Sequence, residues 1–317
     1  MALLAFLAGL VLLALAGDQL VNGAVAIARR LDVPSLIIGL TIVAIGTSMP
    51  ELVVAVEAAL QNHPELAVGG VVGSNISNAL LIIGLPALVT PFGNEDKLTR
   101  RTGLIMLLVT ALFILAMWDG QLDQIEGLAM IAGLALFILV NYWLAQRLGA
   151  DAENAAETGQ PPANPRLLPA LLQVTFGLGG LILGGQLTVD GALGIAEFFH
   201  LSAGAVGLTI VALGTSLPEL AAGLAAARKG HPGLAVGNVI GSNVVNILGI
   251  MGITAALSPI AVPARILTQD MWIMLVSGTV LIGLLYLTRR VGRRIGALLS
   301  LAYLAYLIEV LVLGVAS

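Results

Sequence analysis

Two glutamates, Glu51 and Glu219, occupy matched positions in an otherwise strongly apolar chain. The sequence around the first, GLTIVAIGTSMPEL at 39–52, recurs 168 residues later as GLTIVALGTSLPEL at 207–220, with 12 of 14 residues identical. Each glutamate lies near the middle of a long apolar segment, where a carboxylate costs at least about 2.5–3.5 kcal/mol on insertion scales. We therefore expect both carboxylates to face an interior cavity and to share one site.

Each glutamate follows residues that interrupt a helix. Pro50 lacks a backbone N–H and clashes with the carbonyl of Gly46, and Pro218 occupies the matched position in the second copy. Carbonyls near the break, including those of Ala44 and Ala212, are then expected to turn inward as ligands. Unsatisfied backbone inside a membrane is tolerated only where it lines a cavity, and paired broken helices are typical of transporter binding sites.

A second motif is also duplicated. HPELAVGGVVGSNISN at 63–78 recurs as HPGLAVGNVIGSNVVN at 231–246, with 11 of 16 residues identical. Residues four apart share one face of a helix, and the motif places serine and asparagine at that spacing. The pairs are Ser74 with Asn78, and Ser242 with Asn246.

Together the motifs supply carboxylate, amide, hydroxyl and carbonyl oxygens, without sulfur or a buried histidine. Oxygen ligands suit hard cations such as Na⁺ and Ca²⁺, and two glutamates match the charge of one divalent ion. The predicted metal ligands are Glu51, Glu219, Asn78, Asn246, Thr47, Ser48, Thr215, Ser216, Ser74 and Ser242, with the carbonyls of Ala44 and Ala212.

Other polar residues near these motifs are open to plainer interpretations. The threonine and serine hydroxyls can bond back to their own helix instead of binding an ion. We interpret Gly69, Gly73, Asn75 and Asn243 as packing residues, because small and amide side chains join membrane helices. The remaining assignments are helix caps for His63 and His231, and vestibule or interface positions for Asp18, Glu57, Asp190 and Glu309.

The composition of the chain decides its broad class. Of 317 residues, 58% are hydrophobic and 10% are charged, and the mean hydropathy is +1.02. A soluble protein of this size could not keep so much apolar surface from water, so we predict a polytopic membrane protein and exclude a cytoplasmic enzyme. Aromatic residues make up 4% and cysteine is absent, which argues against nucleic-acid stacking platforms, disulfides and thiolate chemistry.

Ten segments are long and apolar enough to cross a membrane as helices. They are 2–28, 33–60, 66–89, 102–118, 125–146, 167–196, 202–227, 233–257, 269–288 and 296–315. With this count, 13 of the 14 lysines and arginines fall in the loops after the odd-numbered segments, and the exception is Arg265. The positive-inside rule then places those loops in the cytoplasm and both termini outside it.

The repeat offset defines two halves of an all-α protein. We predict a first five-helix repeat at 1–148, a polar cytoplasmic linker at 149–166 and a second five-helix repeat at 167–317. An odd number of spans in each half inverts the second repeat relative to the first, an architecture of secondary transporters. The first segment could also be a cleavable signal sequence, but its weak match to the sixth segment favours a place in the mature protein.

The paired GTSxPE and GSNxxN motifs resemble the α-repeats of the calcium/cation antiporter superfamily, and the chain is similar to prokaryotic sodium/calcium exchangers. The resemblance implies ten helices with both termini outside, ion sites formed by helices 2, 3, 7 and 8, and long helices 1 and 6 that slide against that core. It implies the ligand set given above apart from Asn246. At the position of Asn246, superfamily members carry either aspartate or asparagine.

The function expected from these observations is secondary active transport, with Na⁺ exchanged for Ca²⁺ at a midplane site and Ca²⁺ extruded from the cell. The alternatives are a Ca²⁺/H⁺ antiporter on the same fold and a passive cation channel. No enzyme motif is present, so we expect neither catalysis nor a cofactor. The expected partners are Ca²⁺, Na⁺ and the lipid bilayer of a prokaryotic inner membrane, without nucleic acid.

Overall fold

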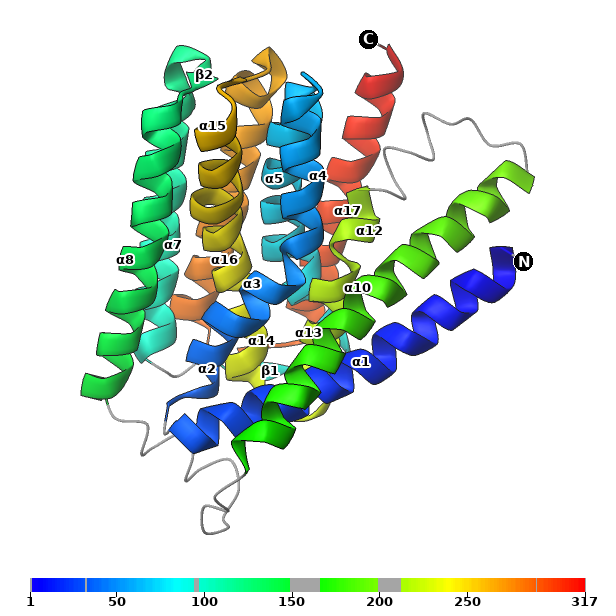
Figure 1. The fold of residues 1–317 in the computed structure, drawn as a ribbon, viewed down its shortest axis with the longest axis vertical. Coiled ribbons are helices and arrows are strands. Elements are labelled where there is room, and N and C mark those ends of the chain that lie inside the picture. The colour runs from blue at the N-terminus through cyan, green and yellow to red at the C-terminus, as the bar shows by residue number, and fades with distance from the viewer. Residues whose placement is uncertain are drawn as a thin grey trace.

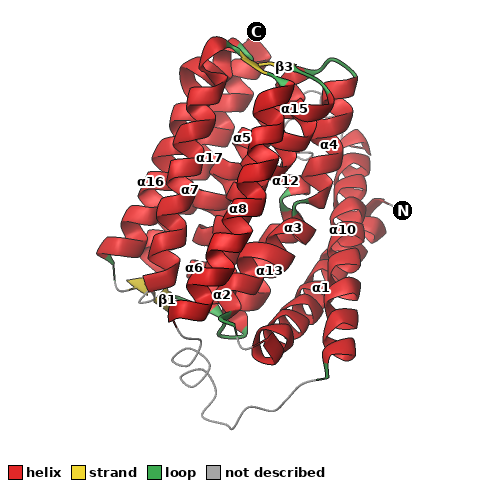
Figure 2. Ribbon diagram, turned by 60° about the vertical axis from the view of Figure 1, so that its left-hand side comes forward, coloured by secondary structure: helices red, strands yellow, loops and turns green. Residues whose placement is uncertain are grey.

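The computed structural model describes residues 2–31, 33–93, 97–148, 166–198, 212–288 and 290–316. Helices dominate these residues, and the strands are two-residue segments at the two ends of the molecule (Figures 1 and 2). The cytoplasmic linker predicted at 149–166 lies outside the described residues except for Arg166.

The elements that precede residue 149 begin with one long helix, continue with a broken helix, and end with three further spans. In order they are α1 (Ala2–Leu31), α2 (Ser35–Ile38), η1 (Gly39–Val43), α3 (Ala44–Thr47), α4 (Met49–Leu60), α5 (Pro64–Ser77), η2 (Asn78–Ile82), α6 (Ile83–Val89), β1 (Phe92–Gly93), α7 (Lys97–Ala116), η3 (Met117–Asp119), β2 (Gln121–Leu122) and α8 (Gln124–Leu148).

The later elements repeat this order over the residues that are described. They are α10 (Leu167–Phe198), α12 (Ala212–Thr215), α13 (Leu217–Arg228), α14 (Pro232–Val244), η5 (Val245–Met251), α15 (Gly252–Leu257), β3 (Ile260–Ala261), η6 (Ile266–Asp270), α16 (Met271–Leu287), β4 (Arg290–Val291) and α17 (Arg293–Ala316). The segments η1, η2, η5 and η6 are π-helical turns, a wider helix that is frequent at functional sites.

Seven helices in the described part of the chain are long and apolar enough to cross a membrane, and the bent pair formed by 35–47 and 49–60 makes eight. The two remaining predicted segments are 202–227 and 296–315. The first contains α12 and α13 from Ala212 onward, and the second corresponds to α17. The earlier part of the predicted segment 202–227 lies outside the described residues. The protein is therefore an all-helical membrane protein, as the composition predicts.

The long helices α1 and α10 lie side by side and cross the other helices obliquely on one side of the molecule (Figure 1). The remaining helices form an upright bundle, in which α5 and α14 are central. Within the span that starts at Pro232, 83% of the most apolar window is buried, against 33% for α1. Lipid therefore faces α1 and α10, while protein surrounds α14.

Two short antiparallel sheets join elements that are distant in the sequence. Phe92 pairs with Val291 in the sheet of β1 and β4, and Leu122 pairs with Ile260 in the sheet of β2 and β3. Each sheet contains one strand that precedes residue 149 and one that follows residue 166. The two sheets lie at opposite ends of the bundle (Figure 1), so backbone hydrogen bonds tie the two parts of the chain together at both ends.

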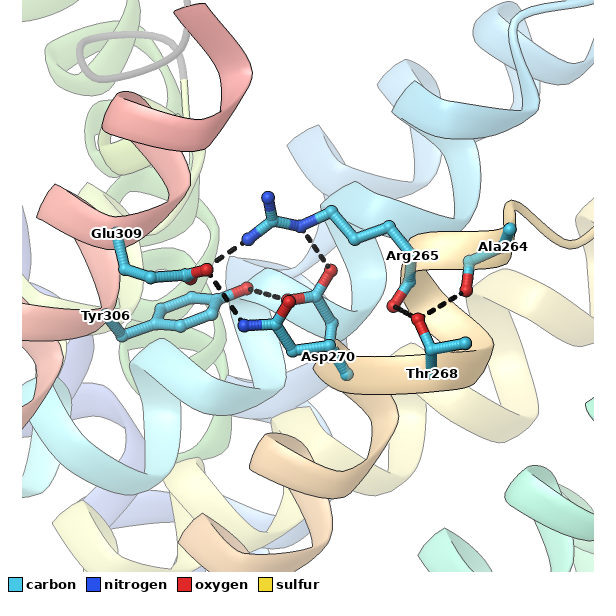
Figure 3. A network of polar contacts seen from close by, with 7 residues as sticks. Ala264, Arg265, Thr268, Asp270, Tyr306 and Glu309 are labelled. Atoms are coloured by element: carbon cyan, nitrogen blue, oxygen red, sulfur yellow. Dashed lines mark hydrogen bonds and ion pairs between the residues drawn. The ribbon is translucent and has the colours of Figure 1, made fainter. Parts of the chain in front are cut away.

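Arg265, the exception to the charge distribution, is neutralised by two acidic residues (Figure 3). Its guanidinium bonds the carboxylate of Asp270 at 3.1 Å and that of Glu309 at 2.9 Å. Gln269 donates to the other oxygen of Glu309 at 2.8 Å, and the Tyr306 hydroxyl donates to Asp270 at 3.4 Å. This cluster joins the start of the ninth predicted span to α17.

Candidate functional site

Both predicted helix breaks are present. Ser48 separates α3 from α4 with φ −84° and ψ 7°, and Ser216 separates α12 from α13 with φ −88° and ψ 1°. The helices on either side of Ser48 meet at 46°. A proline occupies the first turn of α4 and of α13, where its missing N–H leaves no bond unmade. The prediction that the helix is interrupted just before each proline is therefore confirmed in both copies.

Glu51 and Glu219 lie in the first turn of α4 and α13 and are 6% and 1% exposed. The N-terminus of a helix carries a partial positive charge, which stabilises a carboxylate that water does not reach. The two carboxylates lie close enough for their charges to interact. The structure thus brings the two repeat-related acids into one buried site.

Each acid interacts with at least one hydroxyl group from the other copy of the repeat, and Glu51 also interacts with Ser74 of its own copy. The Ser48 hydroxyl donates to Glu219 Oε1 at 3.0 Å, and Thr47 also lies within hydrogen-bonding reach of Glu219. Glu51 interacts with the hydroxyls of Thr215 and Ser74. The site is therefore shared between the two copies, and neither copy is complete without the other.

Several buried oxygens of the site accept no hydrogen bond from the described residues. Buried polar groups are almost always hydrogen-bonded, so a cluster of unsatisfied acceptors indicates that another positive group binds there. Eleven buried side-chain atoms in the described chain lack a partner. Six of them belong to predicted ligands: Glu51 Oε2, Glu219 Oε2, Asn78 Oδ1, Asn246 Oδ1, Ser216 Oγ and Ser242 Oγ. An oxygen cluster with two acids suits a hard cation.

The backbone carbonyls near the breaks remain partly bonded within their helices. The carbonyl of Ala44, which we expected to be freed by the break, accepts a bond from the Ser48 N–H at 3.1 Å. The helical hydrogen bond of this carbonyl is still made, because the helix is interrupted only after it. One lone pair of the oxygen is therefore occupied by the Ser48 N–H, and only the second is available to an ion. The backbone of Ala212 is helical in α12.

The asparagines interpreted as packing residues join the two copies. Asn75 donates to the carbonyl of Asn243 at 3.4 Å and accepts from Asn246 Nδ2 at 3.0 Å. Asn75 also contacts the sulfur of Met274, and Asn243 contacts that of Met106, which is 168 residues before Met274. Asn75 therefore fixes the amide nitrogen of Asn246 and leaves its oxygen free.

The remaining polar residues considered in the sequence are not among the contacts of Glu51 and Glu219 described above. His63 and His231 directly precede α5 and α14, as predicted for caps, but neither side chain makes a capping hydrogen bond. Asp18 pairs with Arg228 at 2.9 Å, which is an interface position. Glu57 lines a cavity of about 590 Å³ beside α4. Asp190 lines another of about 420 Å³, whose wall includes Pro50, Thr215 and Pro218.

Sequence reasoning missed two features of the site. The first is the π-helical turn that begins at Asn78 and its counterpart that contains Asn246, for which the sequence carries no strong signal. The second is Asn238, a buried residue in contact with Thr47. The signal for Asn238 was available, because it lies four residues before Ser242 and replaces a glycine of the first copy. In the described part of the chain, histidine and acidic residues form no cluster of three or more.

Comparisons with known proteins identify the family of the chain. The model of the family described as "Sodium/calcium exchanger protein" matches residues 1–143 and 169–312. The chain therefore belongs to the sodium/calcium exchanger protein family, and it is an integral membrane transporter of that family.

Relatives match along nearly the whole chain. A protein named "Putative antiporter CaxA" from Alkalimonas amylolytica is 40% identical over 95% of both chains. Inner membrane protein YrbG of Escherichia coli is 37% identical, covering 94% of this chain and 93% of the relative. The sodium/calcium exchanger MaX1 of Methanosarcina acetivorans is 32% identical, with 96% and 97% covered. A solved structure of the sodium-calcium exchanger NCX_Mj superposes with a TM-score of 0.84 at 30% identity, over 98% of each chain.

Proposed function

We propose that the protein is an antiporter that exchanges Na⁺ for Ca²⁺ across a prokaryotic inner membrane and extrudes Ca²⁺. The observation that carries the proposal is the pair of buried carboxylates, Glu51 and Glu219, surrounded by unsatisfied neutral oxygens. Na⁺ and Ca²⁺ both bind such oxygens, whereas a proton needs only the carboxylates. Relatives named as sodium/calcium exchangers support the same choice of ions.

The proposed ligands are the twelve residues predicted from the motifs. Glu51 and Glu219 bridge Ca²⁺ at the centre, and Na⁺ ions compete for oxygens that overlap with the Ca²⁺ site. The neutral oxygens come from side chains at the break and on the neighbouring helices, and from two backbone carbonyls. They are Thr47, Ser48, Thr215, Ser216, Ser74, Ser242, Asn78 and Asn246, with the carbonyls of Ala44 and Ala212.

The proposed topology has ten spans in two inverted repeats, at 1–148 and 167–317, with both termini outside the cytoplasm. Its support is the 168-residue repeat in the sequence and the directions of the broken helices. In Figure 1, α4 runs from its break toward one end of the bundle, while α13 runs from its break toward the other end. The two sheets, each with one strand from either part of the chain, support the same two-fold relation.

Coupling follows from the charge of the site. Two ionised carboxylates that lie close together out of water repel each other and lose solvation, so a site without cations is costly to enclose. Bound Ca²⁺ or Na⁺ neutralises the carboxylates, and access to the site can then change from one face of the membrane to the other. Because only the ion-bound protein changes between the outward-facing and inward-facing states, Na⁺ moves in one direction and Ca²⁺ in the other.

The test is ⁴⁵Ca²⁺ uptake into proteoliposomes under Na⁺, K⁺ and pH gradients imposed one at a time. We expect uptake driven by an outward Na⁺ gradient, and loss of nearly all of it in Glu51→Gln and in Glu219→Gln. Glu57→Gln is the matched control, because Glu57 lies on the same helix but is bonded to Gln61 at the surface. Full Na⁺-driven flux in either site variant contradicts the proposal.

The same experiment separates the alternatives. Uptake driven by a pH gradient without Na⁺ identifies a Ca²⁺/H⁺ antiporter on the same fold. Flux that only dissipates a Ca²⁺ gradient, and never runs uphill, identifies a passive cation channel.

A further inference from the structure

Asn238 is a buried polar residue of the second copy without an equivalent in the first. It lies on α14 one turn before Ser242 and two turns before Asn246, so the three side chains share a helix face. It is 1% exposed. The residue 168 positions earlier is Gly70. The two copies of the site therefore differ at this position by a whole amide side chain.

The contact of Asn238 is with a hydroxyl of the site. Thr47 Oγ1 donates to Asn238 Oδ1 at 3.4 Å, and it lies 3.5 Å from the carbonyl oxygen of Ala44. Thr47 also lies within reach of Glu219. A hydroxyl has one proton and two acceptor lone pairs, so only one of these acceptors can take its proton at a time. When Asn238 takes it, both lone pairs of Thr47 remain for a cation.

The repeat mate of Thr47 has different surroundings. Thr215 interacts with the carboxylate of Glu51, and at Gly70 no side chain can take its proton. A Cβ built on Gly70 meets no described atom within 4 Å. Both threonines therefore lie beside a carboxylate, and Thr47 has a neutral acceptor, Asn238, in addition. The two threonines are chemically unequal although their motifs are nearly identical.

The unused end of the Asn238 amide argues that this residue is not kept for packing. Its Nδ2 is buried and has no partner among the described residues. Leaving a buried N–H unsatisfied is unfavourable for folding, and a glycine, as in the first copy, would avoid it. Retention of the amide therefore requires a compensating contribution from its oxygen, which contacts the hydroxyl of Thr47.

We propose that Asn238 is a positioning residue of the ion site, which holds the proton of Thr47 away from the cation and so makes the Thr47 oxygen a ligand. This inference rests on the proposed function, because it assigns Thr47 to a Ca²⁺ site.

The test is a double-mutant cycle measured as Ca²⁺ binding to the purified full-length protein by isothermal titration calorimetry. Asn238→Ala should raise the Kd for Ca²⁺ about fivefold, the typical effect of one buried hydrogen bond. In the Thr47→Val background the same substitution should change the Kd less than twofold. In the Thr215→Val background, the matched control from the other copy, the fivefold effect should persist. Asn238→Gly, which copies the first repeat, should behave as Asn238→Ala and serves if the alanine variant does not fold.

An equal effect of Asn238→Ala with and without the Thr47 hydroxyl would overturn the inference, since a residue that only packs acts regardless of Thr47. No effect in either background overturns it as well. The proposed function has a separate readout, because Ca²⁺ binding needs no gradient. If the effect of Asn238→Ala depends on Thr47 but the protein shows no Na⁺-driven flux, the proposed exchange is refuted and the positioning role stands. If the protein shows Na⁺-driven flux but the effect does not depend on Thr47, the exchange stands and the positioning role is refuted. A wild-type protein that binds no Ca²⁺ refutes both.

Discussion

At the scale of single residues, the site is asymmetric although its sequence is repeated. Ser48 donates to Glu219, whereas the buried hydroxyl of its mate, Ser216, has no partner among the described residues. A hydroxyl that is already bonded contributes to the folded state without ions. An unsatisfied hydroxyl opposes folding and is useful only when a cation binds it. Substitution of Ser48 should therefore lower the stability of the ion-free protein, whereas substitution of Ser216 should weaken ion binding.

We expect Ser216→Ala to unfold at the same temperature as the wild type, or higher, in buffer without Na⁺ or Ca²⁺. Its stabilisation by Ca²⁺ should be smaller than that of the wild type, because a ligand oxygen is lost. Ser48→Ala should be destabilised by about 1 kcal/mol without ions, since it loses a buried bond to a carboxylate. Thermal unfolding in detergent with and without Ca²⁺ measures both. A lower melting temperature of Ser216→Ala without ions would argue that its hydroxyl is structurally bonded.

At the scale of elements, the helix that carries Ser242 and Asn246 packs closely on the helix before the first break. A Cβ on Gly241 would lie 2.6 Å from the carbonyl oxygen of Leu40, and one on Gly237 would lie 2.5 Å from that of Leu36. Close backbone approach is therefore required where α14 meets α2 and η1.

Gly241→Ala should destabilise the protein by about 2 kcal/mol, because a carbonyl oxygen and not a flexible side chain must move. Gly179→Ala is the control, because this helical glycine is exposed and its built Cβ meets no described atom within 4 Å, and it should change the stability by less than about 0.5 kcal/mol. Thermal unfolding in detergent compares the two variants. Equal losses would show that the close approach of Gly241 to the Leu40 carbonyl is not the cause.

The cluster around Arg265 connects elements in a different way, through charge. The side chain of Asp270 is 6% exposed, whereas those of Arg265 and Glu309 are about one-third exposed. Removing one partner of a buried ion pair leaves an uncompensated charge, which costs roughly 3–5 kcal/mol. Exposed ion pairs contribute less than about 1 kcal/mol.

Arg265→Ala should therefore lower the stability by about 3 kcal/mol, and Arg265→Ala combined with Asp270→Asn should recover a large part of it. Arg228→Ala, which breaks the exposed pair with Asp18, should cost less than about 1 kcal/mol. Chemical or thermal unfolding of the purified variants provides the comparison. A double variant no more stable than Arg265→Ala would show that the unpaired Asp270 charge is not the cause.

At the scale of the whole molecule, the inverted repeat requires a specific orientation in the membrane. Each two-stranded sheet joins one strand from either part of the chain, and one sheet lies at each end of the bundle (Figure 1). The lysines and arginines of the predicted odd-numbered loops assign one of these ends to the cytoplasm. The strand pair of β1 and β4 should be cytoplasmic, and that of β2 and β3 should be outside.

The chain has no cysteine, so a single introduced cysteine reports its own side of the membrane. Gln124→Cys, at an exposed position beside β2, should react with a membrane-impermeant maleimide in intact spheroplasts. Lys97→Cys, at an exposed position after β1, should react only after permeabilisation. The reverse pattern would place both termini in the cytoplasm.

The sequence by itself determined the membrane class, the repeat, the two helix breaks and the burial of the two matched acids. These follow from local causes: apolar length, the missing N–H of Pro50 and Pro218, and the high cost of a carboxylate in lipid. Only the tertiary structure decided which oxygens remain unsatisfied and which are bonded. Ser48 and Ser216, or Thr47 and Thr215, are indistinguishable by motif, and their partners come from helices that are distant in the chain. Such hydrogen bonds depend on how helices that are distant in the chain pack together, and residue spacing within one helix carries no information about that packing.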